Sequence, residues 1–224
     1  MKIERLIVVG CGGIGTHFIP TALRLLHYGA ESVVDGRRIT FIDGDRYEEK
    51  NQHRQLFIPE WVGINKAEAM AMQHQYQSVE DIETVGRYLE HEEDFAGILA
   101  EGTGSQRDDE FTLVAVCVDN DATRKMIYEG CRLVNTNVAV IDMANELYTG
   151  DVILWARLKD GTEMYPWPPR LYPNLATPGD RPPQAYCQMA APDSPQIITA
   201  NMMAACIGAD YMYRVMRNMP VKAQ

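Results

Sequence analysis

The sequence predicts an α/β protein whose mostly parallel sheet is covered by helices on both faces. Three observations support this class: apolar runs alternate with helical patterns, the first apolar run leads directly into a glycine-rich turn, and 46% of the 224 residues are hydrophobic. That apolar share is ample for a buried core. Alternating strands and helices are typical of β-α-β units, in which neighbouring strands are parallel.

The elements follow one another in a regular order. The first strand is the apolar run at residues 6–9, and the first helix extends from about Ile14 to His27. Later apolar runs predict strands, and segments of helical composition or pattern predict helices. The expected strands are 38–42, 82–85, 111–118, 138–141 and 150–158, and the expected helices are 66–77, 92–101, 122–133 and 197–217.

A proline-rich segment precedes the last helix. Nine of the twelve prolines lie between Pro166 and Pro195. Proline has no amide hydrogen and restricts the residue before it, so we expect neither a helix nor a central strand there. Because a helix follows, we interpret residues 160–195 as a long crossover loop within a single domain spanning residues 1–224, and not as a tail.

Composition excludes several classes of protein. The formal net charge of −10 argues against nonspecific nucleic-acid binding and against attraction to an anionic membrane. We find no signal region and no apolar stretch of the roughly 18–20 residues that a membrane span needs. The five cysteines are scattered without C-x-x-C spacing, so neither a disulfide framework nor a zinc site is expected. A cytoplasmic location is the simplest interpretation.

The most informative motif is the turn Gly-Cys-Gly-Gly-Ile-Gly at residues 10–15. Its glycines lack the Cβ atoms that would block a tight turn and the close approach of a phosphate. The N-terminus of the next helix directs its amides and its positive dipole end to the same place. This Rossmann-like motif predicts a nucleotide site and, taken alone, favours NAD or FAD.

Two acidic residues are candidates for binding the ribose. Asp35 fits the usual spacing of about 20 residues from the glycines, but it precedes the second strand. Asp43 follows that strand at its carboxyl end, where open α/β sheets bind nucleotides. We favour Asp43, with Asp35 as the open alternative.

The charged motifs that follow are unlike those of a dehydrogenase. Residues 43–55 read D-G-D-R-Y-E-E-K-N-Q-H-R-Q, residues 63–67 read G-I-N-K-A, and residues 119–124 read D-N-D-A-T-R. Hydride transfer does not need cations and carboxylates around the phosphates. Nucleotidyl transfer does, because charge accumulates on the phosphoryl oxygens. An aspartate at the end of a strand is a natural ligand for Mg²⁺.

In this order the motifs resemble the ThiF/MoeB-type enzymes and the adenylation half of ubiquitin-activating enzymes, in particular compact bacterial, plasmid and phage members. The resemblance covers roughly residues 5–145 and returns at Ser194-Pro195-Gln196 and the last helix. It implies an ATP- and Mg²⁺-dependent enzyme that adenylates the C-terminal glycine of a small ubiquitin-like or sulfur-carrier protein. Two alternatives stay open: an NAD-dependent oxidoreductase, and a catalytically silent module that binds a nucleotide or a partner.

The resemblance also implies roles for single residues. Asp43 would bind the ribose, and Asp119 would hold Mg²⁺. The equivalent of Arg54 often reaches the other subunit's active site, which implies a homodimer. The full set of implied nucleotide contacts is Gly10, Gly12, Gly13, Gly15, Asp43, Asp45, Asn51, Arg54, Gln55 and Lys66. Taken singly, Arg54 or Lys66 would be a solvated surface charge and Asp119 a helix N-cap.

One cysteine is a candidate nucleophile. Cys187 lies in the proline-rich segment, where relatives with a catalytic cysteine often carry it, and a thiol of low pKa there could form a thioester. An incidental role for Cys187 stays open. Cys11, Cys117, Cys131 and Cys206 are expected to be packing residues, and His53 and His74 surface or packing residues.

Overall fold

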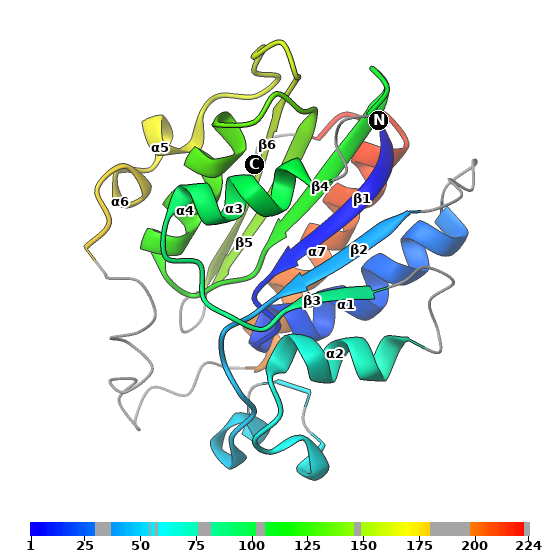
Figure 1. Ribbon diagram of the computed structural model, residues 1–224, viewed down its shortest axis with the longest axis vertical. Coiled ribbons are helices and arrows are strands. Elements are labelled where there is room, and N and C mark those ends of the chain that lie inside the picture. Colours follow the sequence, from blue (N-terminus) through cyan, green and yellow to red (C-terminus); the bar gives the residue numbers. More distant parts are fainter. Residues whose placement is uncertain are drawn as a thin grey trace.

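The protein forms a six-stranded sheet with strand order β3-β2-β1-β4-β5-β6 (Figure 1). The computed structural model describes residues 1–29, 37–53, 55–56, 58–75, 82–101, 106–145, 149–179 and 198–221. The first five strands are parallel, and β6 is antiparallel to β5. The strands are β1 (Lys2–Val9), β2 (Arg38–Ile42), β3 (Ile82–Val85), β4 (Glu110–Val116), β5 (Val138–Asn145) and β6 (Gly150–Arg157). The predicted Rossmann-like α/β class is confirmed.

The strand order reverses between β1 and β4, and the register brings their carboxyl ends together. Val9 at the end of β1 pairs with Ile42 of β2 on one side and with Val116 of β4 on the other. In open α/β sheets, ligands bind at this kind of switch point.

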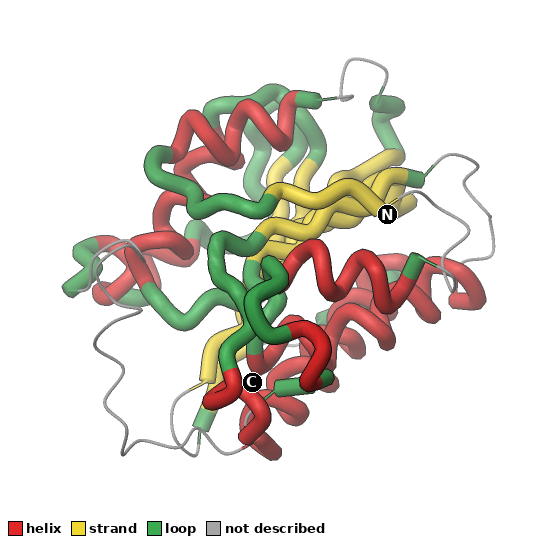
Figure 2. The backbone as a smooth tube through the Cα atoms, turned by 60° about the horizontal axis from the view of Figure 1, so that its bottom comes forward, coloured by secondary structure: helices red, strands yellow, loops and turns green. Residues whose placement is uncertain are grey.

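Both faces of the sheet are buried under helices, as Figure 2 shows. Along β1, Leu6 and Val8 face one apolar cluster, whereas Ile7 and Val9 face the other. The first cluster includes residues of α1 (Gly13–Arg24), α2 (Lys66–His74) and α7 (Ile198–Met216). The second includes residues of α3 (Glu92–Ala100) and α4 (Asp121–Arg132). This two-sided burial explains why the strands read as continuous apolar runs.

Shorter helical turns link these elements. A π-helical turn, Leu25–Gly29, continues α1, and two 3₁₀ turns, Glu49–His53 and Pro59–Trp61, lie between β2 and α2. No helix in the described ranges combines the length and hydropathy that a bilayer span requires.

The expectation that the proline-rich segment contains no helix is wrong for its first part. Two single-turn helices, α5 (Pro168–Leu171) and α6 (Pro173–Ala176), each begin at a proline. At the first position of a helix the missing amide hydrogen has no intrahelical acceptor to lose, so proline is tolerated there. Trp167 anchors the segment, because its ring centroid lies 5.0 Å from that of Trp155 on β6. Residues 180–197 lie outside the described part of the chain.

Candidate active site

Two glycines of the turn are required by close backbone packing. Gly10 has a φ of +94°, and a Cβ there would lie 2.7 Å from the carbonyl oxygen of Cys117. A Cβ on Gly15 would lie 2.1 Å from the carbonyl oxygen of Gly10. The turn from β1 into α1 therefore presses directly against the chain that leaves β4, which no larger residue at these positions would allow.

The other two glycines face side chains from distant segments. Gly12 is the N-cap of α1, and because it has no side chain it makes no capping hydrogen bond to the first amides of the helix. A Cβ at Gly12 would be 3.5 Å from Gln55 Oε1, and one at Gly13 would be 2.5 Å from Nδ2 of Asn201 on α7. The first amides of α1 have no intrahelical acceptor, so this end of the helix is suited to binding an anion.

Asp43 is fixed at the carboxyl end of β2 beside the glycine turn. Its Oδ2 accepts a hydrogen bond from the backbone N–H of Cys11 at 2.7 Å, and its Oδ1 accepts one from the N–H of Asp45 at 2.8 Å. Burial raises the pKa of the Asp43 carboxyl, and Lys66 and the two backbone donors oppose that rise. Asp35, the alternative ribose ligand, lies outside the described residues.

Asp45 and Lys66 form an ion pair at the same edge. Lys66 Nζ lies 2.8 Å from Asp45 Oδ2, and the lysine side chain is 8% exposed while that of the aspartate is 31% exposed. Asn65 links the two segments: its Nδ2 donates to the carbonyl oxygens of Asp43 and Asp45 at 2.8 and 3.0 Å. Its Oδ1 also caps α2, so the start of α2 is tied to the end of β2.

Tyr88 also lies at this site, although the sequence motifs did not predict it. Its hydroxyl donates a hydrogen bond to Asp45 Oδ1, and its ring covers Gly44, where a Cβ would lie 2.3 Å from the ring. The available signal was position, because Tyr88 follows the carboxyl end of β3, at the edge where ligands bind.

Asn51 and Gln55 are both buried after β2, with exposed fractions of 1% and 3%. Asn51 Oδ1 accepts a hydrogen bond from the N–H of Glu48 at 2.9 Å. Neither atom of the Gln55 amide has a hydrogen-bond partner among the described residues. Leaving such a buried group unsatisfied costs about 1–3 kcal/mol, so an amide over Gly12 is well placed to bind a polar ligand.

Asp119 is exposed and follows β4 at the switch point. It makes no hydrogen bond or ion pair with another residue that the structure describes. Asn120, and not Asp119, caps α4, since its Oδ1 accepts from the N–H of Thr123 at 2.8 Å. The N-cap interpretation of Asp119 is therefore wrong. Within the described ranges no group of three or more acidic, histidine or cysteine side chains is arranged to hold a metal ion.

The cysteine predictions have mixed outcomes. Cys11, Cys117 and Cys131 are buried as expected, and burial raises the pKa of each thiol. Cys206 is exposed on α7, so its predicted packing role is wrong; the inward face of that helix is supplied by Ala204, Ala205 and Gly208 instead. Cys187 lies outside the described residues.

The remaining site predictions divide by location. His53 is exposed and His74 is buried, in agreement with surface and packing roles. Arg54 lies outside the described residues. The structure gathers most of the other predicted nucleotide contacts at the carboxyl edge of the sheet, namely Gly10, Gly12, Gly13, Gly15, Asp43, Asp45, Gln55 and Lys66, together with Asp119, while Asn51 lies in the 3₁₀ turn Glu49–His53 and contacts Glu48.

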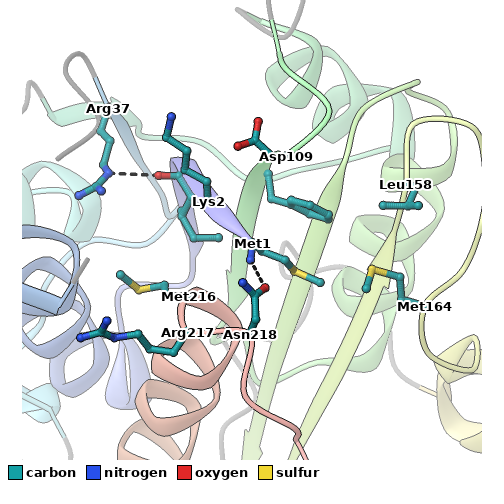
Figure 3. A pocket seen from close by; sticks show the side chains of 11 residues that line it. Met1, Lys2, Arg37, Asp109, Leu158, Met164, Met216, Arg217 and Asn218 are labelled. Carbon is teal, nitrogen blue, oxygen red and sulfur yellow. Dashed lines mark hydrogen bonds between the residues drawn. The ribbon is translucent and has the colours of Figure 1, made fainter. Parts of the chain in front are cut away.

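A cavity of about 630 Å³ lies at the opposite, amino-terminal edge of the sheet (Figure 3). It is lined by residues at the starts of β1 and β4, including Lys2 and Phe111, and by Met216 and Arg217 at the end of α7. It contains none of the motif residues. This cavity is therefore separate from the predicted nucleotide site.

The fold and the carboxyl-edge cluster define a Rossmann-like domain with the features of a nucleotide site at its switch point. The chain belongs to the ThiF family, whose model matches residues 2–222. It is 31% identical over 141 residues to ubiquitin-like modifier-activating enzyme 5 of Drosophila mojavensis, a match that covers 61% of this chain and 33% of that protein. The aligned part is thus about a third of the length of that relative.

Solved structures share the fold. PaaA superposes with a TM-score of 0.61 at 18% identity, covering 98% of this chain and 58% of that one. E. coli MccB with ATP has a TM-score of 0.58 at 17% identity, covering 96% and 56%. E. coli TcdA, a tRNA N6-threonylcarbamoyladenosine dehydratase, has a TM-score of 0.57 at 16% identity, covering 96% and 86%.

Proposed function

We propose that this chain is an ATP- and Mg²⁺-dependent adenylating enzyme of the ubiquitin-activating class. Its substrate would be the C-terminal glycine of a small ubiquitin-like or sulfur-carrier protein. The observation that carries the proposal is the meeting of a glycine turn, a lysine and an unsatisfied buried amide at the switch point. These groups suit a phosphate chain, because backbone amides, a cation and an amide donor all favour anionic oxygens.

The relatives support this choice of ligand and partner. The curated relative is named as a ubiquitin-like modifier-activating enzyme. One MccB structure was solved with ATP, and another with AMPCPP and MccA. ATP and a small partner with a free C-terminus are accordingly the substrates we assign to this chain.

In the proposed reaction, an oxygen of the partner's C-terminal carboxylate attacks the α-phosphorus of ATP. A new P–O bond forms, the bond to pyrophosphate breaks, and an acyl-adenylate and pyrophosphate result. No general base is needed, because the carboxylate is already ionised near neutral pH. Asp43 would orient the ribose, while Asn51, Arg54 and Lys66, supported by Gln55, would hold the triphosphate, so that positioning and charge neutralisation lower the barrier.

Asp119 fits Mg²⁺ by its chemistry and exposure. Mg²⁺ in nucleotide sites is commonly held by one or two carboxylates together with phosphate oxygens and water, so a cluster of protein ligands is not required. The ion would supply neutralisation of phosphate charge.

The proposal also includes one further chemical step and a homodimer. Cys187 would accept the acyl group from the adenylate as a thioester, with release of AMP. In a homodimer, Arg54 of one subunit would reach the active site of the other subunit. A Cys187→Ala variant should still exchange labelled pyrophosphate into ATP but form no reductant-sensitive conjugate; a conjugate equal to that of the wild type would exclude Cys187.

Nucleotide preference tests the class of enzyme. The melting temperature is measured with ATP and Mg²⁺, with NAD, and without ligand, and we expect stabilisation by ATP and Mg²⁺. Stabilisation by NAD alone would favour an oxidoreductase and reject adenylation. Pyrophosphate exchange is then measured with a small β-grasp protein ending in Gly-Gly, and the same protein without its last glycine is the control.

A further inference from the structure

Arg124 holds both ends of the turn between β4 and α4. Its Nη2 donates to the carbonyl oxygen of Val118 at 2.8 Å, and its Nη1 lies 3.4 Å from Asp121 Oδ1. Asp119 and Asn120 lie between these two contacts in the chain. One side chain thus restrains the short segment that carries the exposed Asp119 carboxylate.

The guanidinium is itself held from the sheet. Asp142 on β5 is 1% exposed, and its Oδ1 lies 3.5 Å from Arg124 Nε, an ion pair without a hydrogen bond between these two atoms. Its Oδ2 accepts a hydrogen bond from the Tyr128 hydroxyl at 3.2 Å. A buried ion pair is a weak source of stability, because apolar residues of similar volume often replace it without loss. Stability alone therefore does not account for this pair.

The restrained turn also touches the glycine turn. A Cβ at Gly10 would lie 2.7 Å from the carbonyl oxygen of Cys117 and 3.1 Å from the nitrogen of Val118. Cys117 in turn donates its N–H to the carbonyl oxygen of Val9 at 2.7 Å. A shift of Val118 would therefore have two effects at once: it would disturb the glycine turn and displace Asp119.

We propose that Arg124, fixed by Asp142, is a positioning residue that keeps the Asp119 carboxylate in place for nucleotide-bound Mg²⁺; this rests on the proposed function. Arginine suits the task because its planar guanidinium offers five donors in a rigid fork. It donates to the Val118 carbonyl oxygen and to Asp121 and forms an ion pair with Asp142, a combination that a lysine ammonium on a flexible stem does not reproduce.

The test replaces the ion pair with apolar residues of similar size. In the double variant Arg124→Met/Asp142→Leu no buried charge is left unpaired, although the Tyr128 hydroxyl loses its acceptor, so its melting temperature should fall less than that of Asp142→Leu alone. The Mg²⁺ concentration needed for half-maximal ATP binding, measured by titration calorimetry, should rise about 10- to 100-fold. Without nucleotide, amide hydrogen exchange at residues 118–121 should be faster than in the wild type.

A comparison with Asp119→Asn shows whether Arg124 acts through Asp119. If it does, adding Arg124→Met/Asp142→Leu to Asp119→Asn causes no further rise in the Mg²⁺ requirement. Wild-type Mg²⁺ dependence in the double variant, or effects that multiply, would overturn the positioning role. Should the double variant fail to fold, Arg124→Lys serves the same comparison, since it keeps a cation beside Asp142.

The two proposals fail in different ways. If the wild type does not bind ATP with Mg²⁺, the proposed function is rejected and the positioning role with it. If the wild type binds and Asp119→Asn raises the Mg²⁺ requirement but the Arg124 variants do not, only the positioning role is rejected.

Discussion

Two acid–cation pairs flank the switch point, and they differ in access to solvent. Asp45 and Lys66 meet at 2.8 Å, with the aspartate side chain 31% exposed. Asp142 and Arg124 are 3.5 Å apart at their nearest charged atoms, with the aspartate 1% exposed. If Lys66 moves to a phosphate, water can reach Asp45. If Arg124 moved away, water could not reach the buried Asp142. Under the proposed function, Lys66 would exchange Asp45 for a phosphate, whereas Arg124 and Asp142 would stay paired inside the folded protein.

The largest expected effect comes from breaking the buried pair on one side. Asp142→Leu leaves the Arg124 guanidinium buried without its carboxylate, and the free energy of unfolding should fall by about 3–5 kcal/mol. Urea unfolding at pH 7 measures the change. Asp121→Ala is the matched control: Asp121, 25% exposed, also pairs with Arg124, and its loss should cost less than about 1 kcal/mol. Equal losses in the two variants would erase the contrast between buried and exposed partners.

Breaking the Asp45–Lys66 pair should weaken ligand binding more than it lowers the stability of the fold. Lys66→Met should weaken binding of ATP with Mg²⁺ by about 1.5–3 kcal/mol, because a charge-assisted contact to phosphate is lost. The free energy of unfolding without nucleotide should change by less than about 1 kcal/mol, since Asp45 can turn to water.

The control for the Asp45–Lys66 pair is Lys159→Met. Lys159 follows β6, lies outside the motifs and pairs with Asp108, so the variant removes an unrelated cation. Calorimetric titration should show its ATP affinity equal to that of the wild type. If both lysine variants weaken ATP binding equally, the effect is one of overall charge and Lys66 has no special place in the site.

The carboxyl-edge residues could be predicted because local rules place them. Gly10 and Gly15 follow an apolar run, and Asp43 follows the next one, so the rule that parallel strands end at one edge is enough to gather them. The proline-rich segment misled for the opposite reason. The rule against proline in helices concerns helix interiors, and Pro168 and Pro173 stand at helix starts.

Contacts between distant segments could not be predicted in the same way. Asn201 reaches Gly13 from α7, and Tyr88 covers Gly44 from the end of β3. Neither spacing nor composition encodes such packing, which depends on how α7 and β3 settle on the sheet. The outward position of Cys206 likewise follows from the orientation of α7, whose small residues Ala204, Ala205 and Gly208 face inward.

A smaller effect, with opposite signs for fold and ligand, is expected at Gln55. Gln55→Met removes two buried polar atoms without partners among the described residues, so the nucleotide-free protein should gain about 1 kcal/mol of stability. ATP affinity should fall in the same variant, because the amide no longer bonds to the nucleotide. Chemical unfolding and calorimetry measure the two quantities. A variant that gains stability and keeps wild-type ATP affinity would show that Gln55 faces no ligand.

The smallest effect concerns His17 on α1, which is half-buried and belongs to neither of the two ion pairs. Burial lowers the pKa of His17, and its Nε2 is buried without a hydrogen-bond partner in the described part of the chain. The unfolded chain protonates near pH 6.5, so below that pH it binds more protons than the native state and the free energy of unfolding falls. The loss continues until the pH passes the lowered native pKa, where both states are protonated.

Replacing His17 with glutamine should remove this slope. Between pH 7 and 5 the wild type should lose stability relative to His17→Gln, by no more than about 1 kcal/mol because solvent screens a half-buried charge. Urea unfolding of both proteins across this range measures the difference. A constant difference would mean that the imidazole titrates alike in both states. Relative stabilisation of the wild type at low pH would reverse the sign and require a carboxylate that pairs with protonated His17.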